Sequence, residues 1–269
     1  MELSIIIVNY NTKELLQGCI RSIFQNTKKV TYEIIVVDNN SIDGSQHMVK
    51  KTFPDVLLLC NKKNVGFSSA NNMAYRHSNG EYLLFLNSDT LILDGAIGKM
   101  INYLKTHPQV GIVGPKILNY RHQPCSSFQR FLDVKKLFLG SKYLKHIIDV
   151  EKYRMNYSSY DFTSIRDVEW VSGACLAVRR DVFEKVGLWD ENYFLYYEDM
   201  DLCYQVSKSG YRVVYYPEAE ITHLFGQSAR KSTQNLKKIN KNSMKYYFKK
   251  NYPLIHYWIA VVYSYFHYR

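Results

Sequence analysis

The sequence predicts an α/β fold in which a mostly parallel central sheet is flanked by helices, and three observations support this prediction. Short apolar runs at residues 3–8, 33–37, 56–59 and 82–86 have the length and composition of buried strands. Segments with helical periodicity separate these runs, and such alternation is typical of a parallel sheet built from right-handed crossovers. Each run ends in polar residues, so four polar loops should meet at one edge of the sheet.

Composition indicates a globular protein with an anionic partner. The 269 residues suffice for one large domain, or for one domain with an appendage. Lysine and arginine outnumber the acids 35 to 24, for a formal charge of +11, which favours a nucleotide, a nucleic acid or a lipid headgroup as partner. From Ile221 to Arg269 there are nine basic residues and no acid, so most of the excess charge lies at the C-terminal end.

The cysteines and the N-terminus predict a cytoplasmic protein. The five cysteines are odd in number and widely spaced, and they form no zinc-binding pattern, so we expect reduced thiols. The apolar run at 3–8 is too short for a signal peptide and lacks a basic start, so we expect no export by that route.

The polar strand ends predict a ligand site. Ligands of open α/β sheets bind at the carboxyl ends of the strands. Asp89 directly follows the run at 82–86, where it could hold a divalent cation that in turn holds a diphosphate. The alternative is a turn whose short polar side chains bond their own backbone. No glycine-rich dinucleotide motif or P-loop is present, so side chains and a metal would have to hold a nucleotide.

In the first loop, Asn11 followed by Glu14 predicts a capping box at the start of the first helix.

The second half offers candidates for catalysis. A strand is predicted at 168–178, where small residues in its middle would let a backbone or sugar approach closely. Glu198 and Asp199 begin a predicted helix, where acids either stabilise the helix dipole or act as a base. The aromatic run at 193–197 predicts a pocket wall. His223 follows a strand; it is either a structural histidine or a metal ligand together with Asp89.

The motifs, in their order, resemble family 2 glycosyltransferases of the GT-A fold, and more narrowly the rhamnosyltransferase-like group. They are Ser4-Ile5-Ile6-Ile7-Val8-Asn9-Tyr10-Asn11, Val36-Val37-Asp38-Asn39-Asn40-Ser41 with Asp43-Gly44-Ser45, Asn64-Val65-Gly66-Phe67 with Asn71-Asn72, Phe85-Leu86-Asn87-Ser88-Asp89, Gly187-Leu188-Trp189-Asp190-Glu191, Glu198-Asp199-Met200-Asp201-Leu202-Cys203, and His223 with Gly226 and Ser228. We expect a GT-A domain at 1–228, with a nucleotide-binding half at 1–115 and an acceptor and catalytic half at 116–228. Residues 229–269 should form a basic, aromatic helical extension.

The resemblance also implies roles for single residues. Asp199 would be the general base, and Asp89 with His223 would bind Mg²⁺ or Mn²⁺. The nucleotide would be held by Val8, Asn9, Tyr10, Asp38, Asn39, Asn64, Gly66, Asn87, Ser88 and Asp89, with Asp38 accepting a hydrogen bond from the base. The sugar and acceptor would be contacted by Trp170, Gly173, Ala174 and Glu198. The chain departs from the family pattern at Asn87, where the first acid of the Asp-x-Asp signature would stand, which leaves fewer carboxylates for the metal.

These roles predict an inverting, metal-dependent transferase of cell-surface polysaccharide synthesis. The donor would be dTDP-rhamnose or a UDP-sugar, and the acceptor a glycan or a polyprenyl-linked glycan; no nucleic acid is expected. The extension would either attach peripherally to the inner face of the cell membrane or pack on the domain. A sugar-nucleotide nucleotidyltransferase and a non-enzymatic nucleotide-binding module are the alternatives. The first would carry a Gly-rich, basic loop after the first strand, whereas this chain has Asn9-Tyr10-Asn11-Thr12.

Overall fold

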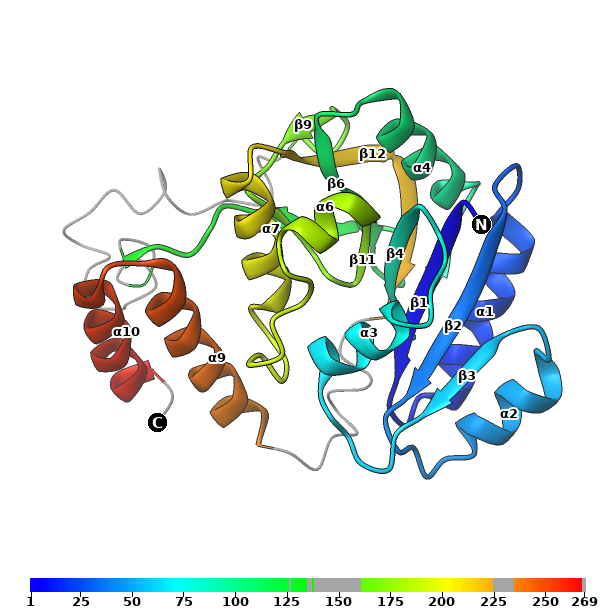
Figure 1. Cartoon of the computed structure of the whole chain (residues 1–269), viewed down its shortest axis with the longest axis horizontal. Coiled ribbons are helices and arrows are strands. Elements are labelled where there is room, and N and C mark those ends of the chain that lie inside the picture. The colour runs from blue at the N-terminus through cyan, green and yellow to red at the C-terminus, as the bar shows by residue number, and fades with distance from the viewer. Residues whose placement is uncertain (126, 135–136, 138–160, 225–234, 268–269) are drawn as a thin grey trace.

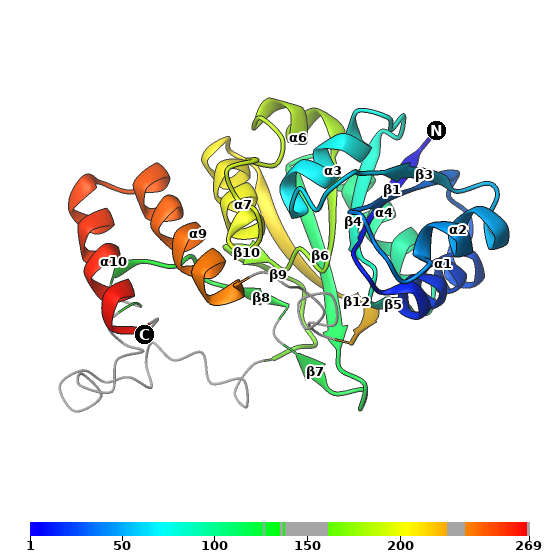
Figure 2. The same ribbon diagram turned by 90° about the horizontal axis from the view of Figure 1, so that it is seen from below.

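A computed structural model describes residues 1–125, 127–134, 137, 161–224 and 235–267. A central sheet with helices on both faces forms the body, and two C-terminal helices lie beside it (Figures 1 and 2). The main path of the sheet has the order β3-β2-β1-β4-β11-β6-β12-β5. The strands on this path are β1 (Leu3–Asn9), β2 (Tyr32–Asp38), β3 (Leu57–Cys60), β4 (Tyr82–Asn87), β5 (Thr90–Ile92), β6 (Val110–Leu118), β11 (Cys175–Arg179) and β12 (Arg212–His223). Short strands at the margins are β7 (Pro124–Cys125), β8 (Phe128–Gln129), β9 (Arg166–Asp167) and β10 (Trp170–Val171).

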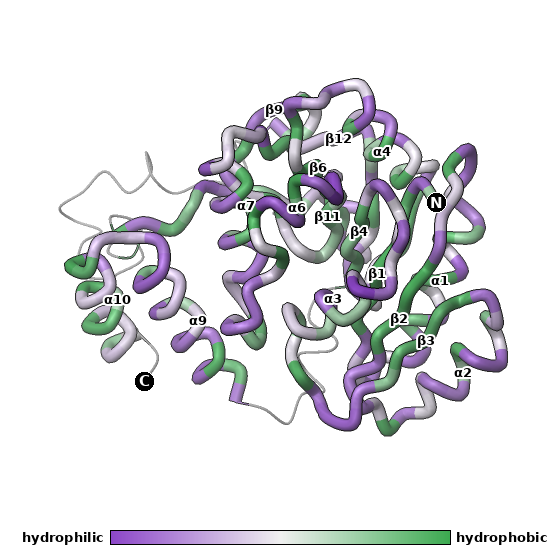
Figure 3. Tube along the Cα trace, viewed as in Figure 1, coloured by the Kyte–Doolittle hydropathy of each residue, from purple (hydrophilic) through white to green (hydrophobic). Residues whose placement is uncertain are grey.

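The first four strands along the sheet are parallel, as predicted. Most side chains of β1, β2 and β4 are buried, on both faces of the sheet, which explains the continuous apolar runs without polar alternation; β3, at the edge, is partly exposed. In β1, Ile5 and Ile7 join one core cluster, whereas Ile6 between them joins the cluster on the opposite face. Figure 3 shows hydrophobic residues along much of β2 and β3, whereas most of helix α2 is hydrophilic.

Two helical layers cover the sheet. The helices are α1 (Lys13–Asn26), α2 (Ser45–Thr52), α3 (Phe67–Tyr75), α4 (Ala96–Thr106), α6 (Arg180–Lys185) and α7 (Glu198–Lys208). Side chains of α1, α2 and α4 fill the cluster on one face, and those of α3, α6 and α7 fill the cluster on the other. Each helix buries one stripe, such as Leu16, Cys19, Ile20 and Ile23 of α1, and leaves its polar residues in water.

Two local predictions are wrong. The predicted strand at 168–178 is interrupted: β10 ends at Val171, a turn at 172–174 follows, and β11 then runs antiparallel between β4 and β6. Asn11 does not cap α1 either, because it has a positive φ of 55° and its side-chain oxygen accepts from the backbone N–H of Ile42. It links two strand-end loops instead, a long-range bond that local sequence cannot reveal.

The C-terminal segment forms a helical hairpin of α9 (Leu236–Asn251) and α10 (Leu254–His267). Met244, Tyr247 and Phe248 of α9 are buried in a third apolar cluster with Tyr193 and Met200 of the body. The predicted alternative of packing on the domain therefore holds for α9. The predicted boundary at 228/229, with Gly226 and Ser228, lies outside the described residues. Within the described ranges, no helix has both the length and the apolar composition to cross a membrane.

Candidate active site

A pocket of about 270 Å³ opens at the carboxyl ends of the parallel strands. Most of the residues predicted to hold a nucleotide line it, together with residues of the 193–197 segment and the first residue of α9. The described lining residues are Val8, Tyr10, Asn39, Asn64, Gly66, Phe67, Asn87, Ser88, Asp89, Phe194, Leu195, Tyr196, His223 and Leu236. The sequence segments that supply them are far apart, and the sheet order brings them to one edge.

Asp89 and His223 meet at this pocket across 134 positions of sequence. Asp89 lies between β4 and β5, and β5 pairs antiparallel with the end of β12, so that His223 faces Thr90 in the sheet register. The Nε2 atom of His223 is 3.1 Å from Oδ1 of Asp89, and both residues are buried. The backbone N–H of Leu224 donates to the carbonyl of Asp89 at 2.9 Å, which holds the two segments together.

The pair has the chemistry of a partial metal site. Two ligands at right angles around an ion with bonds of about 2.1 Å lie about 3.0 Å apart, close to the separation observed here. No group of three or more His, Cys, Asp or Glu side chains suited to a metal occurs among the described residues. One carboxylate and one imidazole would therefore leave the other positions of an Mg²⁺ or Mn²⁺ shell to water and to donor oxygens, as the replacement of an acid by Asn87 predicts.

Asn9 and Asp38 lie beneath the pocket and are not among its lining residues. The carboxylate of Asp38 accepts from Nδ2 of Asn9, from the backbone N–H of Ser41 and from Nε2 of Gln46, each at 2.8 Å. With these donors in place, Asp38 ties the first two strand-end loops together. The arrangement does not bring its carboxylate to the surface where a nucleotide base would bind.

Gly66 lets the 193–197 segment reach the nucleotide side of the pocket. Its φ is +88°, and a Cβ added there would lie 2.5 Å from the carbonyl oxygen of Phe194. That carbonyl accepts from the backbone N–H of Phe67 at 2.7 Å. Only glycine tolerates both the conformation and the close approach. The predicted aromatic wall is present in Phe194 and Tyr196, whereas Tyr193 is fully buried beside α9.

Asp199 stands in the first turn of α7, against the turn at 172–174. The backbone N–H of Gly173 donates to its Oδ2 at 2.9 Å, and the N–H of Met200 donates to its Oδ1 at 2.8 Å. A Cβ at Gly173 would lie 3.2 Å from Cβ of Asp199, so the small residue admits the aspartate side chain. The close approach expected at Gly173 is therefore made by the predicted base itself.

Glu198 and Asp199 are adjacent carboxylates whose surroundings shift their pKa values. Burial, and secondarily the charge of Asp199, raise the pKa of Glu198 well above its ordinary value. Burial also raises the pKa of Asp199, although the N–H groups of Gly173 and Met200 oppose this shift by stabilising the ionised form. Oε2 of Glu198 is buried and has no hydrogen-bond partner among the described residues. The pair therefore favours a protonated Glu198 beside an ionised Asp199.

A short backbone path joins the candidate base to the candidate metal ligands. Gly173 binds Asp199, and the carbonyl of the next residue, Ala174, accepts from the N–H of Asn87 at 2.9 Å. Asn87 lies two residues before Asp89. Asp199 and Asp89 are thus positioned by adjoining parts of one rigid sheet edge, as a site with two cooperating groups requires.

Some placements were not predicted. Phe67 lines the pocket, and Leu236 brings the C-terminal hairpin to it. The apolar character of these two residues gave no sign of a site role, whereas Leu195 belongs to the 193–197 run predicted to form a pocket wall. Trp170 lies at the margin of the body, where its Nε1 donates to the carbonyl of Arg130 at 3.1 Å, and it is not among the pocket-lining residues.

Solved structures share this architecture. The crystal structure of GalNAc-T7 with UDP, GalNAc and Mn²⁺ matches 92% of this chain and 50% of its own, with a TM-score of 0.67 and 16% identity. The mannosyltransferase PcManGT from Pyrobaculum calidifontis, in complex with GDP-Man and Mn²⁺, matches 99% of this chain and 70% of its own, with a TM-score of 0.60 and 17% identity. The predicted GT-A fold, with its central sheet and C-terminal helices, is thereby confirmed.

A comparison of the sequence with family models identifies the family to which the chain belongs. The family model described as glycosyl transferase family 2 matches residues 4–187, more than half of the chain. The chain belongs to this family and is a glycosyltransferase by that membership.

The relatives of this chain include rhamnosyltransferases. The N-acetylglucosaminyl-diphospho-decaprenol L-rhamnosyltransferase of Mycobacterium tuberculosis (strain ATCC 25618 / H37Rv) is 28% identical over 235 residues, which cover 82% of this chain and 75% of the relative. Rhamnosyltransferase WbbL of Escherichia coli (strain K12) is 26% identical over 165 residues, which cover 59% of this chain and 60% of the relative. The predicted resemblance to rhamnosyltransferases is thereby confirmed.

Proposed function

We propose that the protein is an inverting, metal-dependent transferase that moves a sugar from a nucleoside-diphosphate donor to a glycan or polyprenyl-linked glycan acceptor in cell-surface polysaccharide synthesis. One observation carries this proposal: the Asp89–His223 pair lies at the pocket, and the turn at 172–174 joins Asp199 of α7 to the end of β4, two residues before Asp89. A site for the leaving diphosphate and a base for the acceptor hydroxyl are the two groups that inverting transfer needs.

The donor of choice is dTDP-rhamnose, with a UDP-sugar as the second candidate. The names of the mycobacterial relative and of WbbL support rhamnose as the transferred sugar. The solved structures with UDP and with GDP-Man support a nucleoside diphosphate as the leaving group. Val8, Tyr10, Asn39, Asn64 and Gly66 line the part of the pocket formed by the first three strand-end loops, and we assign the nucleoside to it.

The reaction follows from the positions of the side chains. Asp199 accepts the proton of an acceptor hydroxyl while that oxygen attacks the anomeric carbon from the face opposite the diphosphate. The new carbon–oxygen bond forms as the bond to the phosphate oxygen breaks, and its electron pair leaves with the diphosphate, so the configuration inverts. The N–H groups of Gly173 and Met200 hold the Asp199 carboxylate in place throughout.

Asp89 and His223 would hold Mg²⁺ or Mn²⁺, whose chemistry here is the neutralisation of charge on the leaving diphosphate. Two donor atoms 3.1 Å apart at the pocket, and Mn²⁺ in both solved structures, support this assignment. Glu198 lies beside the base and would face the acceptor, where a protonated carboxyl can donate a hydrogen bond.

The acceptor we propose is a lipid-linked glycan, because the mycobacterial relative is named for a decaprenol-linked acceptor. The protein would then work in the cytoplasm, on the inner face of the cell membrane, with peripheral contact through the 229–269 extension. The free cysteines of the chain agree with a reducing compartment. The exposed residues of α10 include Leu254, Trp258 and Phe266, which agree with contact to a membrane interface.

Family membership favours this function over the two alternatives. A sugar-nucleotide nucleotidyltransferase would need basic side chains in the first strand-end loop to bind a triphosphate. Asn9, Tyr10, Asn11 and Thr12 stand there instead. A binding module without catalysis would have no use for an aspartate whose carboxylate is oriented by two backbone N–H groups, as that of Asp199 is.

The test is thermal stabilisation of the purified protein by UDP, dTDP, GDP and CMP, each with Mn²⁺ and each with chelator. We expect dTDP or UDP to raise Tm with Mn²⁺ and to lose most of this effect with chelator. Asp89→Ala should weaken nucleotide binding in Mn²⁺ about 10- to 100-fold or more, since changes even around metal ligands cost this much. The nucleotide that stabilises best names the donor class.

Asp94→Ala is the matched control, because Asp94 is an exposed aspartate that follows β5, outside the pocket. It should leave the Mn²⁺-dependent shift unchanged. A nucleotide shift of equal size with Mn²⁺ and with chelator would contradict the metal assignment. No shift with any nucleotide would contradict the donor site.

A further inference from the structure

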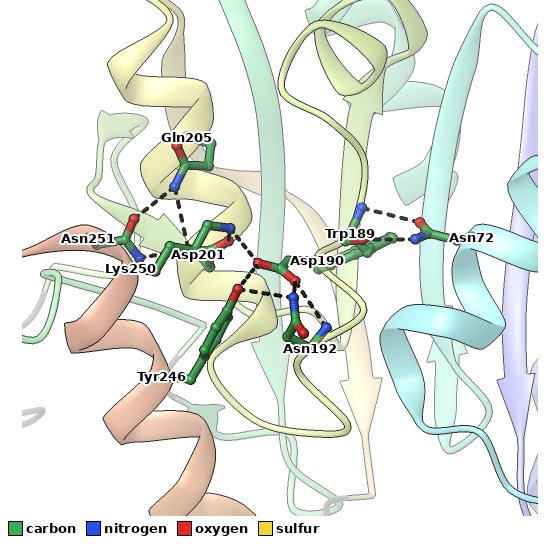
Figure 4. A network of polar contacts seen from close by, with 9 residues as sticks. All are labelled: Asn72, Trp189, Asp190, Asn192, Asp201, Gln205, Tyr246, Lys250 and Asn251. Atoms are coloured by element: carbon green, nitrogen blue, oxygen red, sulfur yellow. Dashed lines mark hydrogen bonds and ion pairs between the residues drawn. The ribbon is translucent and has the colours of Figure 1, made fainter. Parts of the chain in front are cut away.

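An ion cluster lies between the C-terminal hairpin and the active-site helix (Figure 4). Nζ of Lys250, at the end of α9, is 2.7 Å from Oδ2 of Asp190 and 2.7 Å from Oδ2 of Asp201. Asp201 belongs to the first turn of α7, and Asp190 precedes the 193–197 segment. The Asp201 side chain is only 4% exposed and that of Asp190 is 15% exposed, so water screens this cluster weakly.

Further side chains of the hairpin hold the same two carboxylates. The hydroxyl of Tyr246 donates to Oδ2 of Asp190 at 3.0 Å, and Nδ2 of Asn251 donates to Oδ1 of Asp201 at 2.7 Å. Burial alone would raise the pKa of Asp190, but the hydrogen bond from Lys250 and the bonds from Asn192 outweigh it, so the pKa is lowered. Asp190 is therefore held as a carboxylate by Lys250 and by the local donor Asn192, while Asp201 receives its hydrogen bonds from Lys250, Asn251 and Gln205.

The segment between the two acids has a strained backbone. Tyr196 and Tyr197 both have φ of +71°, in the left-handed region that residues with a Cβ rarely adopt. Such conformations cost about 1–3 kcal/mol each and persist only where the surroundings hold them. Glu198 and Asp199 follow directly, so the strained turn determines where α7 begins and where the carboxylate pair points.

The segment is held at several points along its length. At its start, Asn72 of α3 bonds both the carbonyl and the N–H of Trp189 (Figure 4). In its middle, the hydroxyl of Ser243 on α9 donates to the carbonyl of Leu195 at 2.8 Å. On either side of the strained part, Lys250 supplies the positive charge that compensates the half-buried Asp190 and the buried Asp201.

We propose that Lys250 is a positioning residue of the active site, which through Asp190 and Asp201 holds the 190–201 segment so that Asp199 is aimed and the pocket wall is complete. The proposal rests on the proposed role of Asp199 and goes beyond it, because it makes the hairpin a working part of the site. Without Lys250, the buried carboxylate of Asp201 and the half-buried carboxylate of Asp190 would lie close together with no cation between them. The segment would have to move to separate them, and Asp199 would move with it.

The decisive comparison is Lys250→Met against Lys249→Met, its exposed neighbour on the same helix. Transfer is measured as release of dTDP from dTDP-rhamnose or of UDP from a UDP-sugar, whichever nucleotide stabilises the protein, with N-acetylglucosaminyl-diphospho-decaprenol as acceptor. We expect kcat of Lys250→Met to fall about 10- to 100-fold, since misplacement of a catalytic group by about 1 Å has this effect. The donor KM should change much less, and Lys249→Met should behave as the unchanged protein.

Rescue by charge removal separates positioning from general loss of structure. In the double variant Lys250→Met with Asp190→Asn, one of the facing charges is gone while the shape is kept, and kcat should recover at least severalfold. Lys250→Arg keeps the cation and should retain more activity than Lys250→Met. If Lys250→Met does not fold, Ser243→Ala tests the same segment through Leu195 and should lower kcat with little change in Tm.

The outcomes distinguish this inference from the proposed function. If the Lys250→Met variant binds nucleotide and its kcat stays within twofold of that of the unchanged protein, the positioning role is overturned. A fall in kcat that neither Asp190→Asn nor Lys250→Arg relieves also overturns it, because the cation would then not be what matters. Normal turnover of Asp199→Asn would instead overturn the proposed base, whatever Lys250 does.

Discussion

At the scale of single residues, the site depends on a few polar side chains whose surroundings change their chemistry. Asp199 and Glu198 are neighbours in sequence, yet only Asp199 receives backbone N–H groups at its carboxylate. Glu198 has a buried oxygen without a partner in the described part of the chain and a strongly raised pKa. Two adjacent acids thereby acquire different protonation preferences from different contacts.

Asp199→Asn should lower kcat about 10²- to 10⁴-fold, because a carboxamide cannot accept the hydroxyl proton. The variant keeps the size of the side chain, so nucleotide-dependent thermal stabilisation should be unchanged. In the unchanged enzyme, kcat/KM should fall as pH drops through the pKa of Asp199, which burial raises above its ordinary value. Steady-state kinetics with the proposed donor and acceptor across pH 4 to 8 measure both effects, and near-normal turnover of the variant would contradict the assignment.

Glu198→Gln should stabilise the protein at neutral pH. The raised pKa means that the folded protein retains a proton that the unfolded chain has lost, so stability falls as pH rises from the ordinary value towards the raised one. Glutamine carries no such proton, so the gain in Tm should be present at pH 7.5 and nearly absent at about pH 4.5.

Asp55→Asn, at an exposed carboxylate between α2 and β3, is the control for this experiment and should show no comparable gain. Melting curves of the unchanged protein, Glu198→Gln and Asp55→Asn at both pH values measure the gain in Tm. A gain for Glu198→Gln that is equally large at the lower pH would show that packing, and not ionisation, is responsible.

At the scale of elements, turns and strand ends position most of the candidate site residues. The turn at 172–174 binds the candidate base on one side and the end of β4 on the other. The pairing of β5 with β12 brings His223 to Asp89. The contact between Gly66 and Phe194 closes the pocket wall over the first strand ends.

Gly66→Ala should therefore weaken both stability and nucleotide binding. A Cβ would lie 2.5 Å from a carbonyl oxygen, in addition to the cost of a backbone conformation (φ +88°, ψ −178°) that residues with a Cβ rarely adopt, about 1–3 kcal/mol. We expect Tm to fall by several degrees and the nucleotide Kd to rise at least about tenfold. Gly210→Ala is the matched control, because Gly210 has a similar φ of +87° and nothing within 4 Å of its added Cβ.

The two variants separate conformation from contact. Gly210→Ala should show the conformational cost alone and bind nucleotide normally, as followed by thermal shift with dTDP or UDP and Mn²⁺. Equal losses of Tm and unchanged nucleotide binding in both variants would mean that the approach of Phe194 to Gly66 is unimportant for the pocket.

At the scale of the whole molecule, the C-terminal hairpin has two different faces. Its inner face packs on the body through Met244, Tyr247 and Phe248 and reaches the pocket through Leu236. Its outer face carries large exposed apolar residues on α10, at a spacing that places them along one side of the helix. These residues are Leu254, Ile255, Trp258, Val262, Tyr265 and Phe266.

Trp258→Ser with Phe266→Ser should reduce binding to vesicles of anionic phosphatidylglycerol, because each change removes exposed aromatic surface suited to the interface. Binding to neutral phosphatidylcholine vesicles should be weaker for the unchanged protein, since basic residues contribute about 1 kcal/mol each near an anionic surface. Phe24→Ser, at an exposed aromatic residue of α1, is the control. Vesicle co-sedimentation that is equal for all three proteins would contradict the membrane contact.

The sequence by itself determined the strands, the strand-end loops and the family. Apolar runs at 3–8 and 82–86 could only be buried strands, and polar residues had to follow where each strand left the core. Because parallel strands end at one edge, the grouping of Asn39, Asn64 and Asp89 at one pocket could also be predicted, and the structure confirms it. These properties follow from local composition and from the rules of α/β topology.

Only the tertiary structure decided which of these residues face the pocket and what holds them there. It placed Asp38 under the pocket with its carboxylate occupied, divided the strand at 168–178 so that Gly173 meets Asp199, and joined Lys250 to two distant acids. These contacts connect positions 26 to 60 residues apart. Their partners are chosen by packing and by the need to compensate buried charge, which no local pattern encodes.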